Sequence, residues 1–162
     1  MQKRFLVVVA SAVALAVITA AVSGAQSSDP WIGTWKVNLE KSTYSPGPKP
    51  KAGATVKIEP AAGGIKTTID GVNAEGQKTH TESGGAFDGK DNPVKGAQNP
   101  DQTAALRKID ARTYETQTKV GGKPTVLTRI TISADGKTLT ATQSGTNPQG
   151  QAVKNVIVAD KQ

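Results

Sequence analysis

Short runs of alternating apolar and polar residues, each ended by turn-forming residues, occupy most of the chain after residue 30. The first run opens with a Gly-Thr-Trp triplet at residues 33–35, after which Trp35, Val37 and Leu39 alternate with polar side chains. A period of two places successive side chains on opposite faces of a β-strand. We therefore predict a strand here, with Trp35 closing one end of a β-barrel.

Eight further runs of this kind follow the first. Turn chemistry separates them, and the Asp135-Gly136 pair is typical of tight β-turns because it tolerates positive φ. Strands at a spacing of roughly 10–14 residues, with no helical period between them, indicate an all-β sandwich or barrel. The predicted strands cover residues 55–59, 65–70, 78–83, 102–110, 113–120, 125–133, 138–144 and 152–159.

Two connections are longer than a turn. Residues 44–53 contain three prolines and two glycines, which cannot pair in a sheet interior, and they predict an extended loop. Residues 84–100 are rich in Gly, Asp, Asn and Pro and predict a wide irregular connection with room for a short strand at its centre.

Local connections throughout favour an up-and-down antiparallel meander of about 8–10 strands that closes into a barrel. The last predicted strand lies at the end of the chain, where it can pair back on the first. Such closure removes the exposed edges that promote aggregation. We predict one barrel domain over residues 26–162, and a monomer.

The first 25 residues have the pattern of a signal peptide. Met1-Gln-Lys-Arg4 is basic, residues 5–21 carry no charge, and Ser23 and Ala25 precede the expected cleavage position. A membrane anchor is the alternative, but a spanning helix needs about 20 apolar residues. This run is short, Ala-rich and lacks a basic stop-transfer cluster. We expect cleavage after residue 25, export to the periplasm or the extracellular space, and no stable membrane anchor.

Charge and cysteine content narrow the possible partners. The chain has a formal net charge of +7 and no cysteine, so it forms no disulfide and has no cysteine for a lipid anchor. Its basic residues are scattered singly and in pairs, whereas nucleic-acid-binding proteins cluster them on one face. We therefore predict no nucleic-acid partner.

The stretch Trp-Ile-Gly-Thr-Trp-Lys-Val-Asn-Leu-Glu-Lys-Ser at residues 31–42 resembles the opening of lipocalins and calycins, in which Gly-x-Trp begins the first strand. It is also similar to small lipocalin-like proteins exported by bacteria, as are residues 88–94 and 133–140. The resemblance implies a barrel that binds a small apolar or amphipathic ligand. It also implies a late basic residue, commonly Arg, across the first-strand Trp. The chain departs from this pattern, because its last predicted strand offers only Lys154, with Lys161 beyond it, and its arginines lie earlier.

A barrel of this kind would hold its ligand among inward-facing side chains. Trp35 has an alternative role as an end plug rather than a residue at the ligand mouth, and Arg107 would either meet an anionic headgroup or face outward. Further candidates for the interior are Val56, Ile65, Val126 and Ile132. The candidate ligand-binding residues are Trp35, Tyr114, His80, Arg107, Ile58, Ile69 and Ile130.

Little in the chain suggests catalysis or metal binding. His80, the one histidine, shares a strand face with Glu82, which would suit an acid–base pair or a haem ligand, or simply a solvent-exposed position. Asp88 and Asp91 lie in a Gly-rich loop that would suit Ca²⁺, but both residues also form turns. No nucleophile elbow or phosphate-binding loop occurs. We predict no enzyme activity, no metal and no cofactor.

Two functions therefore remain, with a minor third. The protein is either an exported, non-catalytic binder of a small apolar or amphipathic molecule, or an interaction protein of the cell envelope whose barrel is filled by its own side chains. The third is an enzyme or haem protein that uses His80. A small barrel can be filled or can hold one ligand, so the volume of its interior separates the first two.

Overall fold

The chain folds into ten antiparallel strands in a computed structural model, which describes residues 29–162. Within these residues, no helix has the length and hydropathy to cross a membrane. The predicted signal peptide lies outside the described residues. The strands are β1 (Gly33–Thr43), β2 (Ala52–Ala61), β3 (Gly64–Val72), β4 (Lys78–Ala86), β5 (Asp88–Pro93), β6 (Gln102–Lys108), β7 (Thr113–Val120), β8 (Lys123–Ile132), β9 (Thr138–Thr146) and β10 (Ala152–Lys161).

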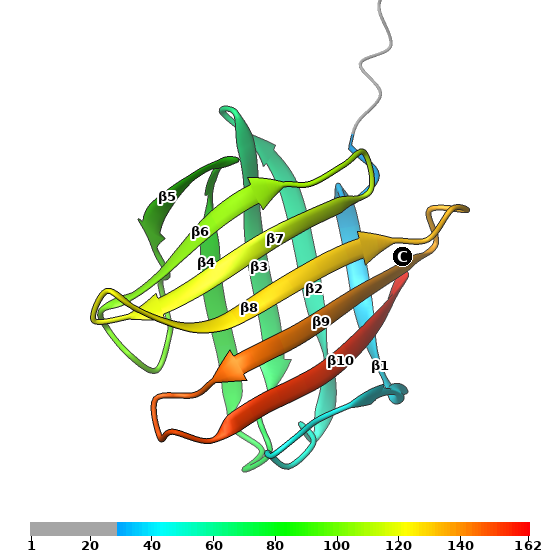
Figure 1. The fold of residues 1–162 in the computed structure, drawn as a ribbon. Coiled ribbons are helices and arrows are strands. Elements are labelled where there is room, and N and C mark those ends of the chain that lie inside the picture. The colour runs from blue at the N-terminus through cyan, green and yellow to red at the C-terminus, as the bar shows by residue number, and fades with distance from the viewer. Residues whose placement is uncertain (1–28) are drawn as a thin grey trace, which may run out of the picture.

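All ten strands belong to one sheet in the order β4-β3-β2-β1-β10-β9-β8-β7-β6-β5. Figure 1 shows this sheet curled into a barrel, with β2, β3 and β4 behind β6–β9. The first and last strands pair, and Val37 lies opposite Ala159. The predicted all-β meander, with its last strand returning to its first, is confirmed.

The barrel is nearly closed, and its seam lies between β4 and β5, the two edges of the sheet. Closure therefore covers the edges of β1 and β10, whereas β4 and β5 meet without a continuous ladder. Glu82 and Lys95 close part of the seam with two backbone hydrogen bonds of 3.0 and 2.8 Å. Gly96 follows with φ +71°, and a Cβ there would lie 2.1 Å from the His80 carbonyl oxygen, so only glycine fits. The connection over residues 84–100 thus contains β5 and the segment that bridges the seam.

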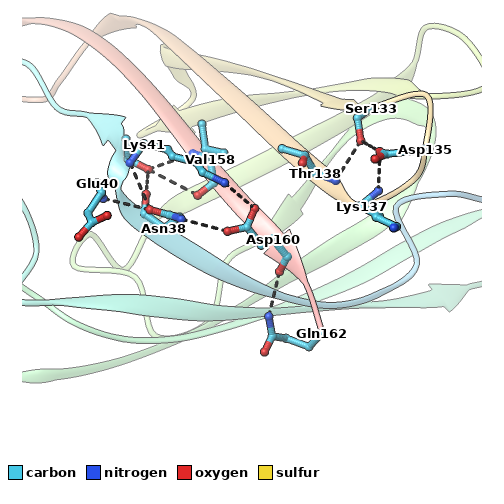
Figure 2. Close-up of polar contacts among 11 residues, drawn as sticks. Asn38, Glu40, Lys41, Ser133, Asp135, Lys137, Thr138, Val158, Asp160 and Gln162 are labelled. Carbon is cyan, nitrogen blue, oxygen red and sulfur yellow. Dashed lines mark hydrogen bonds and ion pairs between the residues drawn. The ribbon is translucent and has the colours of Figure 1, made fainter.

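The pairing of β1 with β10 is interrupted by a bulge in β1. The register with β10 shifts between Asn38 and Thr43. At the shift, the buried Ser42 hydroxyl donates to the Asn38 carbonyl oxygen at 2.6 Å and accepts from the Val158 amide at 3.0 Å. The Asn38 amide also donates to the Asp160 carboxylate at 3.0 Å (Figure 2). Side-chain hydrogen bonds therefore connect β1 and β10 where the regular backbone ladder is interrupted.

The hairpin predicted at Asp135-Gly136 joins β8 to β9. Gly136 has φ +70°, as a tight turn requires. The Asp135 carboxylate accepts from the Lys137 amide at 3.1 Å, and the Thr138 amide donates to the Ser133 hydroxyl at 2.9 Å (Figure 2). Side-chain oxygens thus bind the amides that the turn leaves without ladder partners.

Candidate ligand-binding cavity

A cavity of about 510 Å³ occupies the barrel interior. It runs from the buried core beside Tyr114 to the end of the barrel where residues 44–51 connect β1 to β2. We call these the closed end and the open end. The residues that line the cavity are Val37, Tyr44, Pro50, Ala52, Ala54, Val56, Ile58, Thr67, Ile69, Gly71, Val72, Asn73, Thr79, Thr81, Ser83, Val94, Gln102, Ala104, Tyr114, Thr116, Thr118, Thr128, Ile130, Leu139, Ala141, Gln143, Ile157 and Ala159.

Tyr114 forms the floor of the cavity, with a cluster of aromatic side chains behind it. Tyr114 packs edge-on against Trp31, with ring centroids 5.2 Å apart, and against Phe87 at 5.8 Å. Trp31 and Phe87 complete the triangle at 5.9 Å. Burial raises the pKa of the Tyr114 hydroxyl, and a hydrogen bond with Thr67 offsets this only in part. The floor therefore presents a neutral phenol to the cavity at ordinary pH.

Both tryptophans are fully buried beneath this floor. The Trp35 indole donates to the Trp31 carbonyl oxygen at 2.8 Å. Each ring has a lysine ammonium over its face, Lys161 at 5.0 Å from the Trp35 centroid and Lys108 at 4.9 Å from that of Trp31. Such cation–π contacts stabilise by about 0.5–1 kcal/mol where exposed. Lys161 is therefore the late basic residue that lies over Trp35.

The interior has two chemically different sides. Strands β1, β2 and β10 supply only apolar side chains, and we call this side the apolar wall. Strands β3, β4, β7 and β8 supply seven hydroxyls along with apolar side chains such as Ile69 and Ile130, and we call the seven hydroxyl-bearing residues the hydroxyl wall. The apolar wall consists of Val37, Ala52, Ala54, Val56, Ile58, Ile157 and Ala159, and the hydroxyl wall of Thr67, Thr79, Thr81, Ser83, Thr116, Thr118 and Thr128.

A row of polar side chains extends from the hydroxyl wall toward the open end. The Gln143 amide donates to the Thr128 hydroxyl at 3.4 Å, and the Asn155 amide donates to Gln143 Oε1 at 2.8 Å. Asn155 Oδ1 in turn accepts from the Ser45 amide at 2.8 Å. Hydrogen bonds therefore link the interior of β8 and β9 to the loop that follows β1.

That loop, residues 44–51, is fixed at both of its ends. The Lys154 amide donates to the Ser45 carbonyl oxygen at 2.9 Å, and the Lys51 amide donates to the Asn73 carbonyl oxygen at 3.2 Å. Tyr44, the first residue of the loop, lines the cavity, and partial burial raises the pKa of its hydroxyl. The loop is therefore held across the rim between β10 and the β3–β4 turn.

Four of the seven candidate ligand-binding residues line the cavity: Tyr114, Ile58, Ile69 and Ile130. Trp35 does not, because it lies in the core below the floor. The aromatic residues converge at the closed end rather than around a ligand mouth. Val56 also lines the cavity, whereas Ile65 and Ile132 belong to the buried core and Val126 is outside the lining set.

His80 and Arg107 lie on the outer side of the barrel, so their assignment to the ligand site needs correction. Thr79 and Thr81 face the cavity, and alternation turns His80 outward, where its Nδ1 lies 2.7 Å from the Asp70 carboxylate. Arg107 follows the inward-facing, buried Leu106 and lines a second, polar pocket of about 330 Å³ outside the barrel cavity. Neither side chain contacts the interior.

The aspartates of the 84–100 segment do not converge on a cation. Asp88 accepts from the Lys90 amide at 3.1 Å, which contributes to a lowered pKa of its carboxyl group. Asp91 forms an ion pair with Lys119 at 2.9 Å. Within residues 29–162, no three His, Cys, Asp or Glu side chains gather as a metal site would require. The two aspartates act in turn formation and charge pairing.

The threonines of the hydroxyl wall were missed in sequence reasoning that looked for large apolar side chains. The signal was present, because Thr67 alternates in phase with Ile65 and Ile69, and Thr116 with Tyr114. Every second residue of a strand faces the same side. The phase fixed by one large residue therefore assigns its small polar neighbours to the interior as well.

Comparison with known proteins shows the fold alone. No family model matches the chain, and no curated protein matches it. Three solved structures match over 82% of this chain, each with a TM-score of 0.50. They are a redesigned β-barrel named b11L5F_LGL (13% identical, 92% of that chain covered), the redesigned β-barrel mFAP1 bound to DFHBI (15%, 95%) and EF1p2_mFAP2b bound to DFHBI (12%, 94%).

Proposed function

We propose that this protein is an exported, non-catalytic barrel that binds one small apolar or amphipathic molecule in its interior. The observation that carries the proposal is the cavity of about 510 Å³ above the aromatic floor. Ligand pockets in proteins have volumes of roughly 300–1,000 Å³ and are lined mainly by apolar side chains. Both properties fit the interior of this barrel.

The alternative, an envelope interaction protein with a filled barrel, fits the interior less well. Its small side chains, such as Ala54, Ala104 and Ala141, leave space where larger residues would fill it. Cavities cost stability, because the surrounding side chains lose packing contacts. A cavity of this size is most readily understood when something binds there. Two proteins of similar fold, mFAP1 and EF1p2_mFAP2b, bind DFHBI, a small dye, which supports the same function.

The direct experiment is native mass spectrometry of the protein purified from its own host. We expect a retained small molecule, released on denaturation. Ala141→Phe places a large ring in the cavity and should abolish retention, because Ala141 faces inward. The matched control is Thr142→Phe, one residue along β9 on the exposed outer face, which should retain the molecule. Empty wild-type protein that also binds no added amphiphile would contradict the proposal.

Export is tested separately. Because we propose cleavage after Ala25, the intact mass of the protein recovered outside the cytoplasm should correspond to a chain that begins at Gln26. A full-length protein in the membrane fraction would refute this part of the proposal without affecting the ligand site.

A further inference from the structure

The position of polar groups in the cavity carries information about the ligand. A barrel for a single-chain amphiphile needs an apolar interior and polar groups at the mouth alone. Here the hydroxyl wall runs the full depth of the cavity, from Thr67 beside the floor residue Tyr114 to Thr79 and Thr118 nearer the open end. The polar groups of a matching ligand are therefore distributed along its length.

The hydroxyls of this wall are available for binding. Thr79, Thr81 and Thr116 all line the cavity, so an occupant of the interior meets their side chains. A threonine hydroxyl can donate one hydrogen bond and accept others. Leaving such groups unpaired beside a bound apolar chain costs about 1–3 kcal/mol each. The hydroxyl wall thus favours a ligand whose facing edge carries carbonyl or hydroxyl oxygens.

The cavity also discriminates by charge. Its lining residues include no Asp, Glu, Lys, Arg or His, and its two tyrosines are neutral at pH 7. At the rim, Lys49 and Lys51 donate to the carbonyl oxygens of Leu39 and Glu75 at 2.9 and 3.4 Å. An ionised group inside would lose its hydration without gaining a partner of opposite charge, which costs several kcal/mol. The ligand should therefore be neutral.

We propose that the ligand is a neutral, facially amphipathic ring compound. Its apolar face lies against the apolar wall, and carbonyl or hydroxyl oxygens on its opposite edge meet Thr81, Thr116 and their neighbours on the hydroxyl wall. This inference rests on the proposed function, because it assigns a chemical class to the occupant of the same cavity.

The test compares four probes by isothermal titration calorimetry with the mature chain. Hydrocortisone is neutral and carries oxygens around a fused-ring system, deoxycholate adds a carboxylate to such a system, and dodecanol and dodecanoate are single chains. We expect hydrocortisone to bind at least tenfold more tightly than any of the other three. Equal or tighter binding of a single-chain probe or of deoxycholate would overturn the inference and leave the proposed function intact.

Substitution of the threonines tests whether the ligand contacts the hydroxyl wall. The double variant Thr81→Val with Thr116→Val should weaken hydrocortisone binding at least tenfold and leave dodecanol binding unchanged or improved. The control is Thr142→Val on the outer face of β9. Circular dichroism and the melting temperature verify folding, and single variants replace the double variant if it is unstable. Unchanged hydrocortisone binding in folded variants would overturn the inference.

If none of the four probes binds, the inference is tested on the molecule that the protein retains when it is purified from its own host. A neutral oxygenated ring compound supports the inference, and a charged or single-chain molecule overturns it. If nothing is retained either, the proposed function fails and this inference fails with it.

Discussion

The two ends of the barrel are held together by different kinds of interaction. At the closed end, Trp31 and Trp35 are wholly buried and pack with Phe87 and Tyr114. At the open end, side-chain and backbone hydrogen bonds hold the strands and the loop over residues 44–51. Apolar burial supplies most of the stability of a domain. We therefore expect the closed end to supply most of the folding stability, and the open end to serve ligand binding.

Two turns at the open end are closed by the same pair of side-chain hydrogen bonds. The β3–β4 turn reads Asn-Ala-Glu-Gly-Gln over residues 73–77, and the β9–β10 turn reads Asn-Pro-Gln-Gly-Gln over 147–151. In each turn, the Asn side-chain oxygen Oδ1 accepts from the backbone amide of the last Gln at 2.8 Å. The Asn side-chain nitrogen Nδ2 donates to Oε1 of the same Gln, at 3.0 Å in the first turn and 2.9 Å in the second. These turns hold the rim in a fixed shape without apolar packing.

The largest expected effect comes from Trp35→Ala at the closed end. Truncation of a buried aromatic residue costs about 3–5 kcal/mol, a large part of the roughly 5–15 kcal/mol that stabilises a small domain. Chemical denaturation should show this loss as a lower midpoint. The exposed neighbour provides the control, since Lys36→Gln should change the free energy of unfolding by no more than about 0.5 kcal/mol.

Tryptophan fluorescence tests separately whether the Trp35 ring is buried. In a Trp31→Phe background, Trp35 should emit at short wavelength and be poorly quenched by iodide, because its ring is buried. An unchanged denaturation midpoint for Trp35→Ala would mean that the closed end does not carry the stability assigned to it.

A smaller effect is expected at the polar junction of β1 and β10. Ser42→Ala removes the hydroxyl that accepts from the Val158 amide at 3.0 Å. A buried donor left without a partner costs about 1–3 kcal/mol. Thermal denaturation should therefore place Ser42→Ala between wild type and Trp35→Ala. A loss equal to that of Trp35→Ala would remove the contrast between apolar and polar ends.

The smallest expected effect is dependent on pH. Hydrogen bonds from Asn38 and Lys41 lower the pKa of Asp160. A carboxyl group with a lower pKa in the folded than in the unfolded chain stabilises the fold above the unfolded pKa of about 4. That contribution is lost as the pH falls through the folded pKa. Asp160→Asn should therefore be less stable than wild type at pH 7, and the difference should shrink below pH 4.

High salt should also reduce this difference, because the Lys41–Asp160 ion pair is exposed. A stability difference that stays constant from pH 7 to pH 3 would show that Asp160 acts through packing rather than through its charge.

Most of the fold could be predicted from the sequence. Alternating runs located nine of the ten strands, and β5 was anticipated only as a short strand within the 84–100 connection. The seam could not be predicted, because it depends on contacts between residues far apart, such as Gly96 against the His80 carbonyl oxygen. Alternation gives the face of each residue but not the neighbour that a strand edge will meet.

The candidate site was only partly predictable for a related reason. Ile58, Ile69, Tyr114 and Ile130 were assigned to the interior by size and alternation, and they line the cavity. His80 was assigned by its chemistry instead. Its strand has no large apolar residue to show which face is inward, and the structure places Thr79, Thr81 and Ser83 there.

The pairing of β1 with β10 also has a consequence for the order of folding. Asn38 and Asp160 meet although 122 positions separate them in the chain. Contacts over such a distance form slowly, because a long loop loses entropy before the contact stabilises it. The hairpins within β2–β4 and within β5–β10 need only local closure and can form first. The barrel is therefore expected to complete its ring late, when the C-terminal strand arrives beside β1, and until then both strands present open edges to other chains.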